Sequence, residues 1–287
     1  MPHGYAVDSS RAIREVAAVL SAAGVASPRV DAEILTGYVL GLPRTGLVGA
    51  PPLRPDQVER LGELVAARAR RVPLQHLVGV AGFHRVELAV GPGVFIPRPE
   101  TELLVEWGLT TVDGPDPVVV DLCAGSGAIA VAVAAARPDA TVYAVENDPV
   151  ALGWLRRNTA ATTVRVVDGD VTDPATLAGL DGRVDLVLCN PPYVPAGTRV
   201  PPEVAGFDPY PAVFSGADGL DVIRELVGRV AALLRPGGWF GVEHHDTQGG
   251  AVMALLRAAG YRGVTDHPDL TGRPRFATGH RLADCTP

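Results

Sequence analysis

The chain contains no lysine and little cysteine. All 25 basic side chains are arginines, set against 32 acids, so the formal net charge is −7. The three cysteines, Cys123, Cys189 and Cys285, form no CxxC pair, which argues against both a disulfide framework and a zinc site. No apolar run reaches the ~20 residues needed to cross a bilayer, and the N-terminus lacks a signal-peptide pattern. We therefore expect a cytoplasmic protein with no membrane partner.

The charge is distributed unevenly. Residues 1–90 carry ten arginines against eight acids, whereas the remainder carries 15 against 24. Tight nucleic-acid binding depends on basic side chains that neutralise phosphates. The acidic second part of the chain therefore disfavours a nucleic-acid partner, and we expect none.

The first 72 of the 287 residues show the 3.6-residue apolar period of helices. Ser9 or Ser10 can cap the first helix, and Pro28 and Pro55 suit first helical positions. The last helix ends in an arginine cluster at residues 68–71, which we interpret as a solvated helix end rather than a partner-binding surface. Residues 1–72 therefore predict a small helical domain.

After residue 72 the pattern of apolar residues changes from the helical period to that of strands. Residues 75–79 and 83–90 predict two strands turning at Ala81-Gly82, so that residues 73–95 form a β-hairpin linker. Residues 96–287 then alternate strands with helices, with strands expected at 118–121, 141–146, 164–167 and 184–189. This alternation implies right-handed crossovers and a doubly wound α/β domain with a mostly parallel sheet.

A small-residue loop follows the first of these strands. Residues 125–130 fit the pattern G-x-G-x-x-A, and Glu146 ends the next strand, where it can accept hydrogen bonds from both ribose hydroxyls of an adenosine-containing ligand. NAD and S-adenosylmethionine both fit. No basic residue lies between 122 and 136, as expected for a ligand without phosphate. Asp121 could meet an ammonium group and Asp170 an adenine amine, although both could instead cap turns.

The most informative stretch is residues 184–193. An apolar strand ends at Asn190, and Pro191, Pro192 and Tyr193 follow at once. Each proline fixes φ and offers a carbonyl without an N–H, so the loop is rigid and rich in acceptors. Strand ends of this kind hold ligands in open α/β sheets. The loop therefore suits a planar group that donates N–H bonds.

This motif resembles that of class I methyltransferases acting on planar amine or amide nitrogens. Further stretches resemble the HemK/PrmC family of peptide chain release factor methyltransferases, namely residues 71–79 with Phe83, 95–102, 203–212, 216–220, and 235–238 with Glu243 and Gln248. The resemblance spans nearly the whole chain. It implies a seven-stranded class I fold, S-adenosylmethionine as cofactor, and transfer to the glutamine of a Gly-Gly-Gln loop in a release factor, with the helical domain recognising the substrate and the enzyme acting as a monomer.

The resemblance also implies site residues. The expected cofactor contacts are Asp121, Cys123, Ala124, Gly125, Ser126, Gly127, Glu146, Asp170, Val171 and Asn190. The substrate would lie against Asn190, Pro191, Pro192 and Tyr193, with Arg98 and Glu100 nearby, and Asn190, Pro191 and Tyr193 would be catalytic. The family usually has Asp where this chain has Glu146, and Gly-Thr or similar at Cys123-Ala124.

Two alternatives remain open. A nucleic-acid base methyltransferase, acting on adenine N6 or guanine N2, would use the same motif. A non-enzymatic or NAD(P)-binding Rossmann protein would share the glycine loop but leave residues 190–193 unexplained. His244, His245 and Asp246 follow a strand and could suggest a metal, but methyl transfer needs none, and we expect none.

Overall fold

The structure is a computed structural model that describes residues 6–282, so that Cys285 lies outside the described residues. The chain folds into two compact units. The first contains the chain up to Val80 and the separate segment Val200–Phe207, and the second contains Ala81–Arg199 and the chain from Asp208 onward. Within residues 6–282, no helix is both long enough and apolar enough to span a bilayer.

The first unit is a helical bundle. Its helices are α1 (Ser9–Ala22), α2 (Pro28–Leu40), the 3-10 turn η1 (Arg44–Leu47), α3 (Pro55–Ala69), α4 (Leu74–Val78) and α8 (Pro202–Phe207). Pro28 and Pro55 begin their helices as predicted. The predicted cap of α1 is wrong: Asp8 caps this helix, because its carboxylate accepts a hydrogen bond from the Arg11 amide at 2.8 Å.

The arginines at the end of α3 also differ from prediction. Arg68 is only 7% exposed, and it donates to Asp31 at 2.7 Å and to Glu203 at 2.9 Å. Arg71 donates to both carboxylate oxygens of Glu203. The prediction of a solvated helix end is therefore wrong for these two arginines. Their shared partner lies more than 130 residues away in the sequence, where no local pattern reveals it.

The linker between the domains is partly helical. The strand predicted at 75–79 is wrong, because these residues lie in α4 and in Gly79, whose φ of +79° ends the helix in the left-handed conformation. The predicted turn at residues 81–82 is wrong too, since both residues belong to β1 (Val80–Phe83). The hairpin itself forms from β1 and β2 (Val86–Ala89), with its turn at His84 and Arg85.

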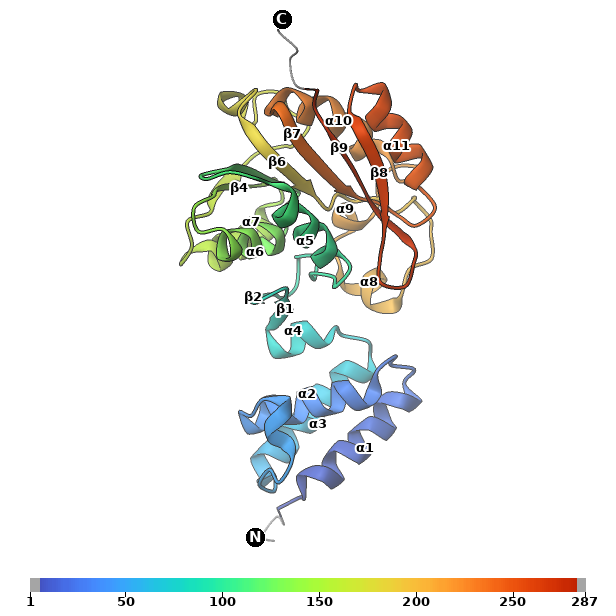
Figure 1. Cartoon of the computed structure of the whole chain (residues 1–287). Coiled ribbons are helices and arrows are strands. Elements are labelled where there is room, and N and C mark those ends of the chain that lie inside the picture. Colours follow the sequence, from blue (N-terminus) through green and yellow to red (C-terminus); the bar gives the residue numbers. More distant parts are fainter. Residues whose placement is uncertain (1–5, 283–287) are drawn as a thin grey trace, which may run out of the picture. The chain divides into compact units, whose positions relative to one another are not determined.

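The second unit contains a seven-stranded sheet with the order β5-β4-β3-β6-β7-β9-β8 (Figure 1). Its strands are β3 (Val118–Leu122), β4 (Thr141–Glu146), β5 (Arg165–Asp168), β6 (Val184–Cys189), β7 (Leu234–Glu243), β8 (Arg262–Pro268) and β9 (Pro274–His280). Strands β5, β4, β3, β6 and β7 are mutually parallel. Strand β9 pairs antiparallel with both β7 and β8, so it is the one strand of the sheet that runs in the opposite direction. The predicted mostly parallel sheet is confirmed.

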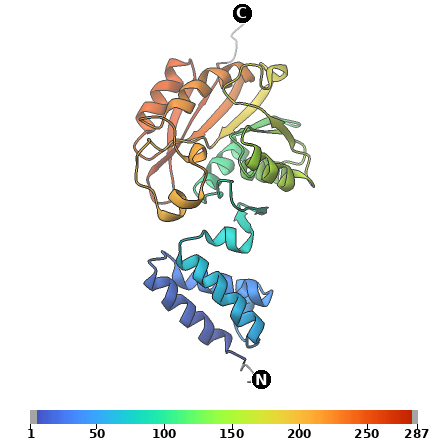
Figure 2. The same cartoon turned by 180° about the vertical axis from the view of Figure 1, so that it is seen from behind.

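Helices cover both faces of this sheet, as Figures 1 and 2 show from opposite sides. One face packs α5 (Thr101–Thr111), α6 (Ala128–Ala136) and α7 (Pro149–Thr159), and the other packs α10 (Asp221–Leu233) and α11 (Gly249–Ala258). Strand β6 lies between them, with Leu186 and Leu188 in one core and Val187 and Cys189 in the other. Burial on both faces explains its unbroken apolar run. Two short elements, η2 (Ala178–Leu180) and α9 (Tyr210–Val213), lie in connecting loops.

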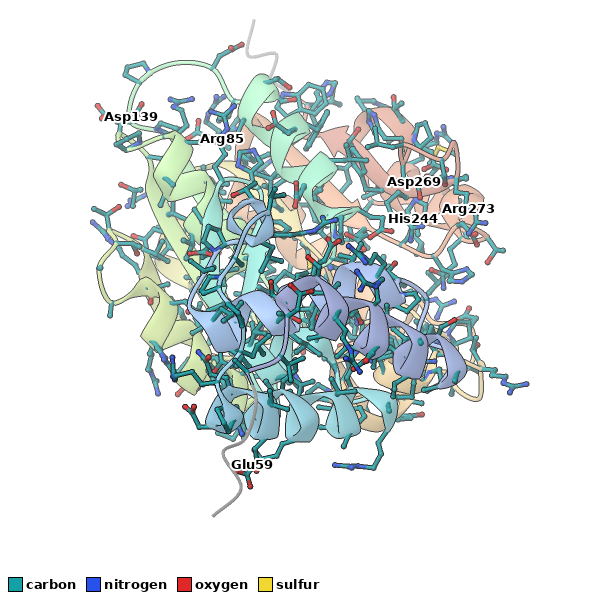
Figure 3. The ribbon with its side chains drawn as sticks, turned by 90° about the horizontal axis from the view of Figure 1, so that it is seen from below. Glu59, Arg85, Asp139, His244, Asp269 and Arg273 are labelled. Carbon is teal, nitrogen blue, oxygen red and sulfur yellow. The ribbon has the colours of Figure 1, made fainter. Side chains whose placement is uncertain are left out.

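The loop between β8 and β9 is held by Asp269, which lies beside Arg273 (Figure 3). The Asp269 carboxylate accepts from the amides of Thr271 and Arg273, and from the guanidinium of Arg275. All these contacts are local to the turn, as expected for a structural segment.

Because the five parallel strands run in one direction, their C-terminal ends meet at one edge of the sheet. Leu122, Glu146, Asp168, Cys189 and Glu243 are the last residues of these strands. The loops that follow carry most of the candidate site residues.

Candidate active site

A cavity of about 400 Å³ opens at this edge, within the second unit. Residues predicted to contact the cofactor line it, namely Asp121, Cys123, Ala124, Gly125, Ser126, Glu146, Asp170, Val171 and Asn190. The structure thus brings together side chains that are up to 69 positions apart. Five of the lining side chains are acidic, namely Asp121, Glu146, Asp148, Asp170 and Glu225, and none of the described lining residues is basic. The cavity therefore favours a cationic ligand over a diphosphate.

The glycine loop after β3 has two kinds of glycine. Gly125 has φ +55°, and a Cβ there would meet no atom within 4 Å, so its backbone is open to a ligand. Gly127 has φ +86° and caps α6, and a Cβ there would lie 2.7 Å from the Leu155 side chain. Gly127 therefore serves helix packing, which agrees with its absence from the cavity wall.

Asp121 is the most perturbed acid in the cavity. It is 1% exposed, and one carboxylate oxygen accepts from the Ala130 amide at 3.0 Å while the other has no partner among the described residues. Burial, and secondarily the charge of Glu146, raise the pKa of Asp121 to about 8. An unpaired buried oxygen facing a cavity is a ready acceptor for a cationic donor.

The Glu146 carboxylate holds the loops around it. One oxygen accepts from the Gly125 amide at 2.8 Å, and the other accepts from the amides of Asn147 and Asp148 at 2.9 Å. This residue therefore ties the end of β4 to the glycine loop. Oε2, which accepts only the Gly125 hydrogen bond, keeps a lone pair, and the ribose contact expected of Glu146 stays a prediction.

Asp170 and Val171 line the cavity beyond β5. One Asp170 oxygen accepts from the backbone amide and the hydroxyl of Thr172, at 2.8 and 2.7 Å. These hydrogen bonds lower the pKa of Asp170, so the side chain is an ionised acceptor. It caps a turn, as the alternative interpretation proposed, and still borders the cavity.

Residues 190–193 form one wall. Asn190 and Pro192 line the cavity. The Asn190 Nδ2 donates to the Thr101 hydroxyl at 3.1 Å, and the Tyr193 hydroxyl donates to Glu243 at 2.8 Å. Pro191 and Tyr193 are not among the residues that line the cavity.

The position of this wall is held from behind. The side-chain amide of Gln248 donates to the carbonyls of Tyr193 and Asp218, at 2.9 and 2.8 Å. Gly219 packs closely on the same carbonyl, since a Cβ at Gly219 would lie 2.1 Å from the Tyr193 oxygen. The loop is therefore fixed before any ligand binds.

Arg98 and Glu100 lie outside the cavity lining. The Arg98 guanidinium pairs with the buried carboxylate of Asp208 and lies 4.8 Å above the centre of the Phe95 ring. Glu100 is exposed at the N-cap position of α5, where its side chain caps no helix amide. The predicted substrate contacts of both residues stay untested.

Residues that spacing alone did not single out complete the cavity. Phe83, Phe95, Thr101, Pro209 and Ala212 line it. Glu243 and Gln248 hold the wall from outside. The available signal was the resemblance to the HemK/PrmC family, which included Phe83, 95–102, 203–212, Glu243 and Gln248 but gave none of these seven residues a site role.

Comparisons with known proteins agree with this architecture. Residues 11–79 match the model of the PrmC N-terminal domain, and residues 92–204 match that of the methyltransferase small domain. A release factor glutamine methyltransferase of Mycolicibacterium smegmatis is 51% identical over 273 residues, which cover 95% of this chain and 97% of that protein. A release factor glutamine methyltransferase of Corynebacterium glutamicum is 47% identical over 277 residues, covering 94% of this chain and 98% of that protein.

A solved structure also shares the fold. The 16S rRNA N2 G1207 methyltransferase of T. thermophilus, solved with AdoMet and guanosine, superposes with a TM-score of 0.52 at 23% identity. The match covers 70% of this chain and 49% of that one. The seven-stranded methyltransferase fold predicted from the sequence is confirmed.

Proposed function

Since the chain belongs to the family of release factor glutamine methyltransferases, we propose that it methylates the side-chain amide nitrogen of the glutamine in the Gly-Gly-Gln motif of a peptide chain release factor. The methyl donor is S-adenosylmethionine. One observation carries the proposal: an acidic cavity, with no basic side chain among its described lining residues, is closed on one side by the acceptor-rich loop at Asn190.

The residues of the cavity fit this cofactor. S-adenosylmethionine, when bound, supplies an electrophilic methyl group on a cationic sulfur. The unpaired oxygen of Asp121 would accept from its ammonium group, Glu146 from its ribose, and Asp170 from its adenine amine. The open backbone at Gly125 would allow close approach. A dinucleotide would instead place two phosphates in an acidic cavity, which electrostatics disfavours.

The loop at residues 190–193 would orient the substrate amide. A glutamine amide nitrogen is a poor nucleophile, because its lone pair is delocalised into the carbonyl. The Oδ1 of Asn190 and the carbonyl of Pro191 would accept its two N–H bonds, and Tyr193 would support the amide plane. These contacts favour positive charge as it develops on nitrogen.

Transfer then depends on positioning and electrostatics. The new N–C bond would form as the bond between sulfur and the methyl group breaks, which would leave S-adenosylhomocysteine. The amide proton becomes acidic only as the N–C bond forms and would pass to water, so no dedicated base is required. The loop at residues 190–193 is already held in place by Gln248 and Gly219, which both contact the Tyr193 carbonyl.

The proposal extends to how the enzyme recognises its substrate and where it acts. We assign substrate recognition to the helical domain predicted at residues 1–72, most of which lies within the match to the PrmC N-terminal domain at residues 11–79. We further propose a cytoplasmic monomer whose partner is the release factor. Methylation of a nucleic-acid base is the less favoured alternative, because the similar curated proteins act on release factors.

Incubation of the protein with methyl-labelled cofactor and a purified release factor, followed by mass mapping, tests the proposal. We expect one methyl group on the Gly-Gly-Gln glutamine, and none on a release factor with glutamate at that position. The Asn190→Ala variant should bind S-adenosylhomocysteine normally in calorimetry and lose at least ~10²-fold in rate, the scale of one preorganised polar contact. Near-normal transfer by this variant would contradict the mechanism, and salt-sensitive methylation of DNA or RNA would contradict the substrate.

A further inference from the structure

We propose that Thr101 and Glu243 form a hydrogen-bond relay that sets which end of the Asn190 side-chain amide faces the substrate. Both would be positioning residues, since they act through Asn190 and Tyr193. The inference rests on the proposed function, because it concerns the acceptor oxygen offered to the substrate amide.

The relay joins three elements that are far apart in the sequence. Glu243, the last residue of β7, is 1% exposed, and Thr101, the first residue of α5, is 3% exposed. The Thr101 hydroxyl donates to Glu243 Oε2 at 2.7 Å and lies 3.1 Å from Asn190 Nδ2. Asn190 Oδ1 accepts no hydrogen bond from the described part of the chain.

The proton count gives this chain of contacts a direction. A threonine hydroxyl carries one proton, and a carboxylate can only accept. The Thr101 proton therefore goes to Glu243, which leaves the Thr101 oxygen as an acceptor. Only the NH₂ end of the Asn190 amide can donate to it, so the oxygen end must point the other way.

The opposite orientation would disable the site. An amide rotated by 180° would present N–H groups to the N–H groups of the substrate, and the acceptor would be lost. It would also place two acceptors, Asn190 Oδ1 and the Thr101 oxygen, in contact. Such a repulsive pair is unfavourable, because the buried Thr101 oxygen cannot recover its hydrogen bond from water.

The same carboxylate also holds Tyr193, which we proposed to support the plane of the substrate amide. The Tyr193 hydroxyl donates to Glu243 Oε1 at 2.8 Å, so each carboxylate oxygen receives one donor. Burial raises the pKa of Glu243, whereas the donors Thr101 and Tyr193 and the nearby charge of Arg275 oppose that rise. Glu243 thus links the orientation of the Asn190 amide to the placement of the Tyr193 ring.

Three variants test the relay. Thr101→Val is nearly isosteric and removes only the hydroxyl, and Thr101→Ser restores it. Thr278→Val is the matched control, because Thr278 is 2% exposed, contacts His267 at 2.9 Å and does not line the cavity. Steady-state rates, S-adenosylhomocysteine affinity and thermal stability are measured for each, with the wild-type protein and release factor as reference.

We expect Thr101→Val to lose at least ~10-fold in kcat, because a catalytic acceptor loses its fixed orientation. Its cofactor affinity and stability should match those of Thr278→Val, and Thr101→Ser should recover most of kcat. In an Asn190→Ala background, Thr101→Val should lower the residual rate little, because Thr101 acts through Asn190.

The relay is overturned if Thr101→Val keeps a normal kcat, or if Thr101→Ser is as impaired as Thr101→Val. An equal loss from Thr101→Val with and without the Asn190 side chain also counts against it, since that pattern indicates a general structural effect. A wild-type protein that leaves the release factor glutamine unmodified would instead refute the proposed function, so the two failures are distinguishable.

Discussion

Substitution of Asp121 by asparagine should change how stability depends on pH. The Asp121 carboxyl is 1% exposed, and burial raises its pKa to about 8, compared with about 3.9 in an unfolded chain. Between these two values the folded protein keeps the proton while the unfolded chain releases it. The unfolded state is therefore favoured as pH rises, and the stability contributed by this group falls across that window.

The magnitude follows from the size of the window. Each pH unit between the two pKa values costs about 1.4 kcal/mol, so the wild-type protein should lose ~4 kcal/mol of unfolding free energy between about pH 5 and about pH 8 through this residue. The amide introduced by Asp121→Asn cannot ionise, and it keeps an oxygen for the Ala130 N–H. The Asp121→Asn variant should therefore match the wild-type protein within ~1 kcal/mol near pH 4 and exceed its stability increasingly as the pH rises to about 8.

Urea denaturation followed by tryptophan fluorescence measures this difference, because all three tryptophans, at 107, 154 and 239, belong to the second unit. Asp139→Asn is a suitable control. Its hydrogen bond with Arg137 lowers the pKa of the exposed Asp139 to about 2, so this residue is ionised in both states throughout the window and should not alter the slope. Parallel pH profiles of wild-type protein and Asp121→Asn would refute the reasoning.

Three further outcomes are expected. Gly219→Ala should lower kcat at least ~10-fold, because the added Cβ would press on the Tyr193 carbonyl. Gly228→Ala is the control and should leave kcat unchanged, because its Cβ would meet open space. Equal rates for the two variants would contradict the inference that the loop at residues 190–193 must be fixed. Glu146→Gln should weaken S-adenosylhomocysteine binding in calorimetry, because an amide cannot accept all three backbone N–H bonds that the carboxylate accepts; unchanged affinity would contradict this. Arg68→Met should destabilise the helical unit by ~3–5 kcal/mol in denaturation followed by circular dichroism, because the buried Asp31 carboxylate loses its ion-pair partner, whereas Glu203 keeps Arg71; an unchanged midpoint would count against the ion-pair argument.

Much of the second unit could be predicted because its signals are local. The parallel strands coincide with short apolar runs in the sequence, and β6 forms at the apolar run that ends at Asn190. The glycine loop and the residues at 190–193 follow their strands directly, so their place at the sheet edge follows from topology. The strand predicted at 75–79 was wrong for a local reason as well: five residues between Pro73 and Gly79 suit one helical turn as well as a strand.

Partnerships between distant residues could not be predicted. No spacing connects Arg68 to Glu203, or Thr101 to Glu243, and each pair lies more than 130 positions apart. Glu146 illustrates the same limit. Its side chain is one methylene longer than the aspartate that is usual in the family, and whether it reaches the Gly125 amide depends on how the loops after β3 and β4 fold back.

The sequence by itself determined the fold class and the acceptor loop at Asn190, because periodicity and proline rigidity act within a few residues of the chain. The glycine loop fitted both NAD and S-adenosylmethionine, and the resemblance to the HemK/PrmC family decided between them. The tertiary structure alone decided the electrostatics of the cavity and the orientation of its groups. Burial raises the pKa of Asp121, and a carboxylate from β7 receives the proton of a threonine from α5, so that the asparagine amide after β6 is held in one of its two orientations. Such effects depend on desolvation and on which donors meet which acceptors, and both arise only when distant segments pack together.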